Sequence, residues 1–89
     1  MQTKFDFYED PSHGWCKVPK SVLNTLGIAN KISPYSYERG EFAYLEEDCD
    51  LSVLHDAFLE RGLLLDFRTH VCRNKQSKIR SYSSYRYAG

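Results

Sequence analysis

The sequence predicts a single α+β domain in which two short helices cover one face of a mostly antiparallel sheet. Three features lead to this prediction. The chain has 89 residues, 42% of them apolar, which is enough for one core. Two stretches of strand-forming residues, each interrupted by a turn sequence, indicate two hairpins. Each hairpin is followed by apolar residues at helical spacing, so we expect the element order ββαββαββ over residues 1–89.

The first predicted unit extends to Gly27. Residues 4–8 alternate apolar and polar side chains, and the Asp, Pro and Gly residues of 10–14 favour a turn before a second strand at 15–18. We expect 19–26 to form a short helix, because a proline suits its first position and its apolar residues share one face. Gly27 fits the left-handed position that ends many helices.

The second predicted unit comprises a hairpin over 35–45, turning near Gly40, and a longer helix that ends at Gly62. Asp48 or Asp50 is expected to cap this helix, since acidic residues also favour the positive end of the helix dipole. The apolar stripe predicted for it consists of Leu51, Leu54, His55, Phe58 and Leu59.

Two more strands are expected after the second helix. Residues 63–71 alternate, and 78–85 are predicted to return as the last strand after a polar loop at 72–77. The tail, 86–89, is expected to fray. One side of the first of these strands is predicted to carry Leu63, Leu65, Phe67, Thr69 and Val71.

The composition favours a cytoplasmic location. No apolar run has the length of a membrane span, and residues 1–6 lack the apolar region of a secretory signal. The cysteines, Cys16, Cys49 and Cys72, are odd in number, which argues for reduced thiols and against a disulfide framework. We therefore expect a soluble protein without membrane contact, and the sequence leaves its oligomeric state open.

The charges are balanced overall but separated along the chain. The formal net charge is zero, yet residues 38–60 carry eight acids and one base, whereas residues 61–89 carry seven bases and one acid. The two segments either lie side by side and neutralise each other or form an acidic and a basic face. In the second case, the candidate partner-binding acidic face consists of Glu46, Glu47, Asp48 and Asp50.

Three blocks of the sequence resemble one group of proteins. They read DPxHGW at 10–15, LGIxxKISxYSYxRG at 26–40 and YLEEDCD at 44–50, where x marks a position outside the resemblance. This set resembles a group of small proteins found in proteobacteria and in their plasmids and phages, over roughly residues 4–62. The resemblance implies an accessory protein of mobile elements but no activity. It leads us to expect glycine where Ser12 stands and an aliphatic residue where Cys16 stands, which argues against chemistry at Cys16.

Histidines and cysteines are the candidates for metal or thiol chemistry. They occur in three pairs, His13 with Cys16, Cys49 with His55, and His70 with Cys72. The spacings match no standard zinc module, and nothing near a cysteine indicates an activated thiolate. We therefore assign no metal site, cofactor or catalytic residue and predict that the protein is not an enzyme. A zinc-binding protein is the third hypothesis.

The C-terminal segment combines basic and aromatic residues. Bases neutralise phosphates and rings stack on unpaired nucleobases, as in proteins that bind single strands. The alternative is an edge strand protected by charge and followed by a solvated tail. The candidate nucleic-acid-binding residues are Arg73, Lys75, Lys78, Arg80, Tyr82, Tyr85 and Arg86.

The turn before the second strand is a further candidate surface. His13 and Trp15 flank a glycine there and form a candidate recognition loop, although a lone tryptophan also anchors the core of many small domains. Our first hypothesis is a non-enzymatic binding module of the accessory kind carried by mobile elements, acting on a host protein. The second is a protein that binds single-stranded nucleic acid through its C-terminal segment.

Overall fold

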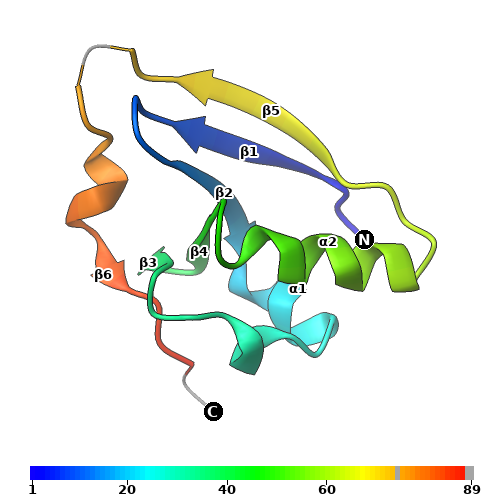
Figure 1. The fold of residues 1–89 in the computed structure, drawn as a ribbon. Coiled ribbons are helices and arrows are strands. Elements are labelled where there is room, and N and C mark those ends of the chain that lie inside the picture. Colours follow the sequence, from blue (N-terminus) through cyan, green and yellow to red (C-terminus); the bar gives the residue numbers. More distant parts are fainter. Residues whose placement is uncertain (74, 88–89) are drawn as a thin grey trace.

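The computed structural model describes residues 1–73 and 75–87 and contains one six-stranded sheet with the strand order β5-β1-β2-β4-β3-β6 (Figure 1). The strands are β1 (Lys4–Glu9), β2 (Gly14–Pro19), β3 (Tyr37–Arg39), β4 (Phe42–Glu46), β5 (Asp66–Val71) and β6 (Ser83–Ser84). The helices are α1 (Lys20–Thr25) and α2 (Leu51–Glu60), with the short 3-10 helices η1 (Ala29–Lys31) and η2 (Lys78–Ser81).

The predicted α+β class is confirmed, and the sheet is mostly antiparallel. β1 and β2 form the first hairpin, β3 and β4 form the second, and β2 pairs with β4 to join them. The exception is β5, which runs parallel to β1 with Asp6 opposite Arg68 and Tyr8 opposite His70. Parallel strands cannot be joined by a tight turn, and here most of the domain separates the two strands in sequence.

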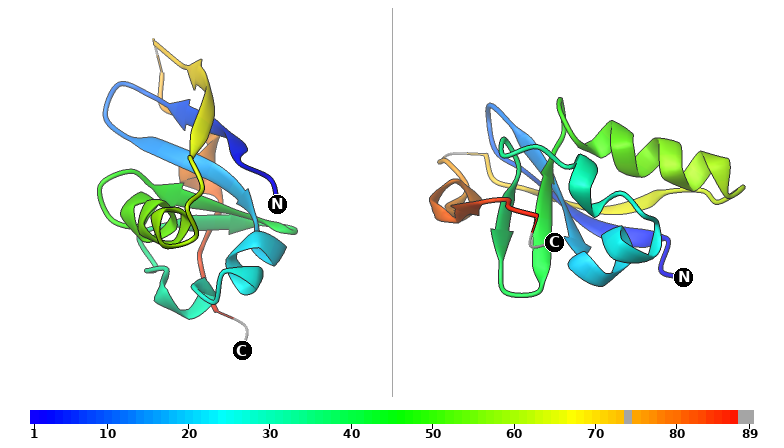
Figure 2. Two further views of the ribbon diagram at one scale, coloured as in Figure 1. Left: turned by 90° about the vertical axis from the view of Figure 1, so that its right-hand side faces the viewer. Right: turned by 90° about the horizontal axis from the view of Figure 1, so that it is seen from below.

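The sheet separates two apolar clusters. α1, α2 and η1 pack on one face, while η2 packs on the other (Figures 1 and 2). Because side chains alternate along a strand, Phe5 and Phe7 of β1 pack under the helices, whereas Tyr8 belongs to the cluster on the second face.

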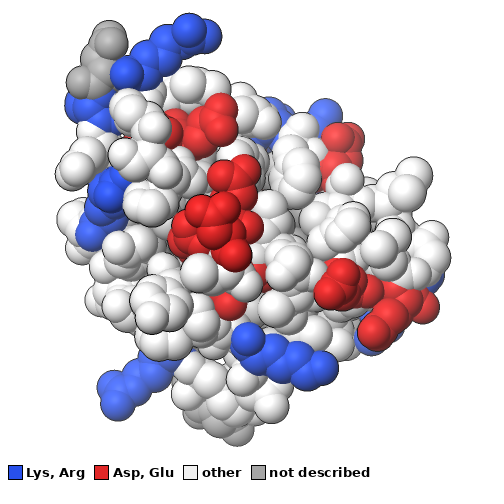
Figure 3. Space-filling view, viewed as in Figure 1, with Lys and Arg blue, Asp and Glu red and all other residues white. Residues whose placement is uncertain are grey.

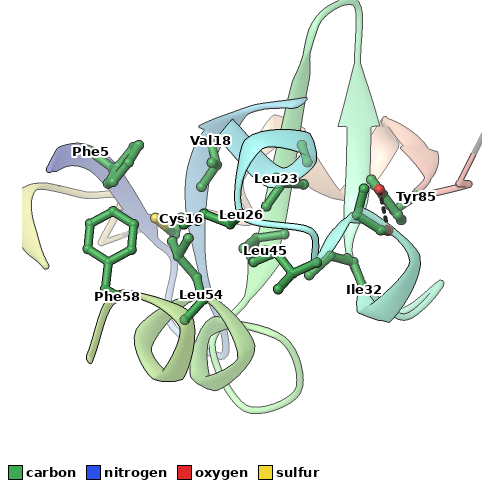
Figure 4. Close-up of a cluster of buried hydrophobic side chains, with 14 of the residues drawn as sticks. Phe5, Cys16, Val18, Leu23, Leu26, Ile32, Leu45, Leu54, Phe58 and Tyr85 are labelled. Carbon is green, nitrogen blue, oxygen red and sulfur yellow. Dashed lines mark hydrogen bonds between the residues drawn. The ribbon is translucent and has the colours of Figure 1, made fainter. Parts of the chain in front are cut away.

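The larger core lies between the helices and the sheet (Figure 4). Phe5 meets Phe58 of α2 edge to face, with ring centres 5.9 Å apart, and Cys16 of β2 is fully buried nearby. Tyr85 enters the same cluster from the C-terminal segment, and its hydroxyl donates to the carbonyl of Ala29 at 2.7 Å (Figure 4). Tyr85 therefore anchors the C-terminal segment in the core.

The last strand is much shorter than predicted. Four of the eight residues, 78–81, form η2 instead, and only the two residues of β6 pair with β3. Ile79 is 2% exposed, since η2 packs it against Trp15 and Tyr44 on the second face of the sheet. The hydroxyl of Ser77 accepts the Ile79 N–H and so caps this 3-10 helix.

The buried stripe of α2 also differs from the predicted one. Leu54, Ala57 and Phe58 are buried, whereas His55 is exposed and Leu59 is 56% exposed. The contact face of the helix is therefore rotated from the predicted stripe towards Ala57 and Val53.

Asp50 precedes α2 at the N-cap position but does not cap the helix with its side chain. Its carboxylate instead accepts hydrogen bonds from the backbone N–H and hydroxyl of Ser33 and from the hydroxyl of Ser36. The residue is 3% exposed, so these bonds satisfy a buried charge and tie the loop before β3 to the start of α2.

The parts of the chain around β5 and at the C-terminus also depart from prediction. β5 is shorter than 63–71, and its Thr69 and Val71 are exposed because this end of the strand lies away from both helices (Figure 1). Arg86, at the start of the predicted frayed tail, donates its N–H to Glu38 at 2.9 Å. Residue 74 of the predicted loop and residues 88–89 of the tail lie outside the described residues.

No helix in the described segments combines the length and apolar character needed to cross a bilayer.

Candidate functional site

An aromatic cluster lies on the second face of the sheet, beneath η2. Trp15, Tyr44 and Ile79 form its buried centre. The partly buried side chains packed against them are Tyr8, Tyr37, Phe42 and Tyr82. Because these four residues are only partly covered, ring surface remains accessible beside η2.

A groove runs between this cluster and η2, with a volume of about 490 Å³. Its aromatic residues are Tyr8, Phe42, Tyr44 and Tyr82, and its basic residues are Lys17, Arg39 and Lys78. One acidic residue, Glu41, also lines it, so three positive charges and one negative charge face the same space. We refer to this site as the aromatic groove.

Two of the basic side chains lie over rings of the groove. The ammonium of Lys17 is 4.2 Å from the ring centre of Phe42, and the guanidinium of Arg39 is 5.0 Å from that of Tyr82. The rings of Tyr82 and Tyr44 are themselves 5.1 Å apart in a tilted arrangement. Cation–π contacts of this kind place positive charge and aromatic surface side by side.

Two tyrosines of the groove, Tyr8 and Tyr44, are neutral hydrogen-bond donors at physiological pH. Burial raises the pKa of both Tyr8 and Tyr44 above the ordinary value of 10.0. The ring of Tyr8 stacks on His70 with centres 4.8 Å apart, and His70 Nε2 lies 2.9 Å from the carboxylate of Asp6. The floor of the groove is therefore continuous with the paired side chains of β1 and β5.

An ion pair between Asp10 and Arg80 holds η2 on the sheet. Arg80 donates from Nε and Nη2 to the Asp10 carboxylate at 2.7 and 3.0 Å, and the backbone N–H groups of Ser12, His13 and Ser77 also donate to it. The Asp10 side chain is fully buried, and the Arg80 guanidinium holds the pKa of this carboxyl well below its ordinary value of 3.8. Arg80 therefore stabilises the fold.

The structure separates the predicted nucleic-acid-binding residues. Lys78 and Tyr82 line the aromatic groove, but Arg80 is bound to Asp10 and Tyr85 is buried in the helix-side core. The remaining three are exposed: Arg73, Lys75 and Arg86.

Sequence reasoning missed five residues of the groove, which come from strands. They are Tyr8, Lys17, Arg39, Phe42 and Tyr44. Strand alternation is the signal that identifies them, because each occupies the position of its strand that faces away from the helices. The composition of 73–87 indicates only the residues that this segment contributes, whereas most of the groove lining comes from strands of the sheet.

The predicted acidic face is divided by the fold. Glu46 is 8% exposed and Asp50 is 3% exposed, so neither belongs to an open surface. Glu47 and Asp48 are exposed, and Figure 3 shows acidic side chains gathered near the turn between β4 and α2. Burial and the nearby charges of Asp48 and Glu9 raise the pKa of Glu47. The acidic surface therefore retains two of its four predicted members.

The candidate recognition loop combines one exposed and one buried side chain. His13 is exposed, whereas Trp15 is 1% exposed and anchors the second cluster. Their ring centres are 6.1 Å apart, and the Arg80 guanidinium lies 5.5 Å from the Trp15 ring. His13 and Trp15 both line a second hollow of about 340 Å³, together with Glu46, Asp48, Cys49, two tyrosines and Arg80, whose guanidinium is bound to Asp10.

No cysteine belongs to a group of three metal-ligating side chains among residues 1–73 and 75–87. Cys16 is buried in the helix-side core, where desolvation raises its pKa to about 12, while its predicted partner His13 is exposed. His55 is exposed on α2, and His70 pairs with Asp6. The pKa of the Cys49 thiol is raised, by desolvation first and then by Glu46, which disfavours a reactive thiolate.

No protein-family model, no curated protein and no solved structure matches this chain.

Proposed function

We propose that the protein binds single-stranded nucleic acid in the aromatic groove. One observation supports this most: four aromatic and three basic side chains line a single open groove on the face of the sheet opposite the helices. Stacking surface beside positive charge is the combination with which proteins hold unpaired bases and their phosphates. The protein then acts by binding, without a catalytic step.

The chemistry assigns a role to each kind of residue. Tyr82 and Phe42 present partly exposed rings on which bases stack, and Arg39 presents a planar guanidinium over Tyr82. Phosphates are neutralised by Lys17, Arg39 and Lys78. Three such contacts with a single strand correspond to a slope of about −2 in a plot of log affinity against log salt concentration.

Fluorescence anisotropy with labelled single-stranded DNA and RNA tests this proposal. We expect Tyr82→Ala to weaken binding roughly tenfold through lost stacking. The matched control is Tyr35→Ala, because Tyr35 is a 72% exposed tyrosine outside the groove. Likewise, Lys78→Ala should flatten the salt dependence, whereas Lys31→Ala, at an exposed lysine of η1, should not. Equal affinity of Tyr82→Ala and wild type for every strand would disprove the proposal.

A second candidate function is the docking of a host protein on the acidic surface, as the resemblance to proteins of mobile elements suggests. The supporting observation is that Glu47 and Asp48 are exposed next to one another, close enough to Glu9 for its charge to act on Glu47. Complementary charge accelerates association with a basic partner.

We also propose a cytoplasmic location, which fits the free thiols of Cys16, Cys49 and Cys72.

Charge reversal distinguishes this second function from the first. The double variant Glu47→Lys/Asp48→Lys should lose a stoichiometric protein partner from a bacterial lysate, while Glu60→Lys at the exposed end of α2 should keep it. Retention of the same partner by the double variant would argue against an acidic docking surface. Neither the double variant nor Glu60→Lys should alter nucleic-acid binding at Tyr82 and Lys78, because the three substituted residues lie outside the groove.

A further inference from the structure

The β1–β2 turn and the β4–α2 turn lie next to each other at one end of the sheet. β2 pairs with β4 so that Trp15 is opposite Glu46, and the N–H of Glu47 donates to the carbonyl of Gly14 at 2.9 Å. This pairing brings His13, just before β2, close to the residues that follow β4. The juxtaposition is built by the sheet and does not depend on sequence proximity.

Three metal-ligating side chains converge where these turns meet. One atom each of His13, Glu46 and Asp48 lies within 4.8 Å of the other two, and no other group of this kind occurs among residues 1–73 and 75–87. Ligands at about 2.0–2.2 Å from a tetrahedral ion are roughly 3.4 Å apart, so small side-chain rotations bring these atoms to coordinating distance.

Glu46 is oriented for this role by its own backbone neighbours. Its Oε2 accepts hydrogen bonds from the N–H groups of Asp48 and Cys49 at 2.8 and 2.9 Å. These bonds fix the carboxylate of a residue that is only 8% exposed. Its Oε1 lies 3.5 Å from His13 Nδ1, which is longer than a charge-assisted hydrogen bond. Fixing one carboxylate oxygen by hydrogen bonds while the other binds the ion is a common arrangement around metals.

The His13 backbone is also fixed. Its N–H donates at 3.0 Å to the buried carboxylate of Asp10, which Arg80 holds in turn. The hollow beside the three ligands is also lined by Trp15.

We propose that His13, Glu46 and Asp48 bind a divalent transition-metal ion such as Zn²⁺, with water in the remaining position. One imidazole and two carboxylates suit a borderline ion better than Mg²⁺ or Ca²⁺, which prefer oxygen ligands alone. Cys49 borders the same hollow, but it is not part of the convergent group, so the site does not require its thiol. This inference is independent of the aromatic groove.

The only tryptophan of the chain reports on this site. Because the Trp15 and His13 rings are 6.1 Å apart, a bound paramagnetic ion such as Co²⁺ or Cu²⁺ should quench its fluorescence. We expect saturable quenching at one ion per chain, and competition by Zn²⁺ should restore the emission. Calorimetry with Zn²⁺ should give the same stoichiometry.

Substitutions then assign the ligands. His13→Ala and Asp48→Asn should each weaken Zn²⁺ binding at least about tenfold, because losing a ligand costs no less than losing a group that orients one. His55→Ala and Asp56→Asn, at exposed positions of α2, are the matched controls, and Cys49→Ser should bind as wild type. Circular dichroism of the His13→Ala variant checks that the fold is intact. Binding that His13→Ala leaves unchanged, or only millimolar binding of an adventitious ion, would overturn the proposal.

Discussion

Gly14 stands at a point in the β1–β2 hairpin where the fold has no space for a side chain. A Cβ atom at this position would lie 2.5 Å from Cζ of Phe7 and 3.2 Å from a carboxylate oxygen of Glu47. We expect Gly14→Ala to lower the free energy of unfolding by about 1–3 kcal/mol, because the Phe7 ring must move out of a packed core. Urea denaturation measures this loss.

A second substitution separates steric conflict from a general intolerance of the turn. Phe7→Leu removes the clashing ring atoms. The double variant Gly14→Ala/Phe7→Leu should therefore lose less unfolding free energy than the sum of the losses in the two single variants. Strict additivity would show that Phe7 is not the group that excludes the methyl. Ser12→Ala, at an exposed position of the same turn, should leave stability within about 0.5 kcal/mol of wild type.

Asp6 makes stability depend on pH at the acidic end. The hydrogen bond with His70 and then the contacts with Arg68 lower its pKa in the folded protein below the ordinary value of 3.8. Between the folded and unfolded values the unfolded chain binds more protons, so the stabilisation is present above pH 3.8 and is lost as the pH falls through the folded pKa. The difference in unfolding free energy between wild type and Asp6→Asn should therefore shrink below about pH 4. A difference that stays constant from pH 6 to pH 2 would contradict this assignment.

At the level of single residues, strand alternation predicts which side chains lie on the second face of the sheet, but it does not predict the groove that they form with η2. Tyr8, Lys17 and Tyr44 occupy positions of their strands that face away from the helices. Their convergence with Lys78 and Tyr82 requires η2 to cross the sheet, which no local pattern indicates. The burial of Asp50 has no local signal either, because its side-chain partners Ser33 and Ser36 lie 17 and 14 residues away in sequence.

Among the elements, η2 and β6 depend most on contacts remote in sequence. Tyr85 fixes the end of this segment by donating its hydroxyl to Ala29 and packing in the helix-side core. Tyr85→Phe should destabilise the protein by about 1–2 kcal/mol, because the buried carbonyl of Ala29 loses its donor while the ring remains. Thermal or urea unfolding of the two proteins measures this difference, and Tyr35→Phe at an exposed position is the control.

The elements that sequence reasoning predicts best are those held together by neighbouring residues. Both hairpins and both α helices lie where turn residues and apolar spacing indicate. The predicted strand at 78–85 fails because Ile79 is buried against Trp15, a contact across more than sixty residues that outweighs the local preference for an extended chain. The predicted apolar stripe of α2 is wrong for a related reason, because the helix packs on the sheet through the face that contains Ala57.

For the whole molecule, the strand order predicts how stability is distributed. β2 and β4 lie in the interior of the sheet, whereas β5 and the two-residue β6 lie at its edges. Amide hydrogen exchange should therefore be slowest in β2 and β4 and fastest in β6, because central strands open only with the whole domain. Equal protection of all six strands would indicate that the domain opens as a single cooperative unit, contrary to this expectation.

The parallel pairing of β1 with β5 also has a consequence for biosynthesis. Asp6 and its partner Arg68 are 62 residues apart, so β1 leaves the ribosome long before the strand that completes its outer edge. At translation rates of about 5–20 residues per second, that edge waits roughly 3–12 s for its neighbour. During this interval the nascent chain presents an unprotected strand to chaperones and to other nascent chains, which makes β1 the part of the protein most exposed to misassembly.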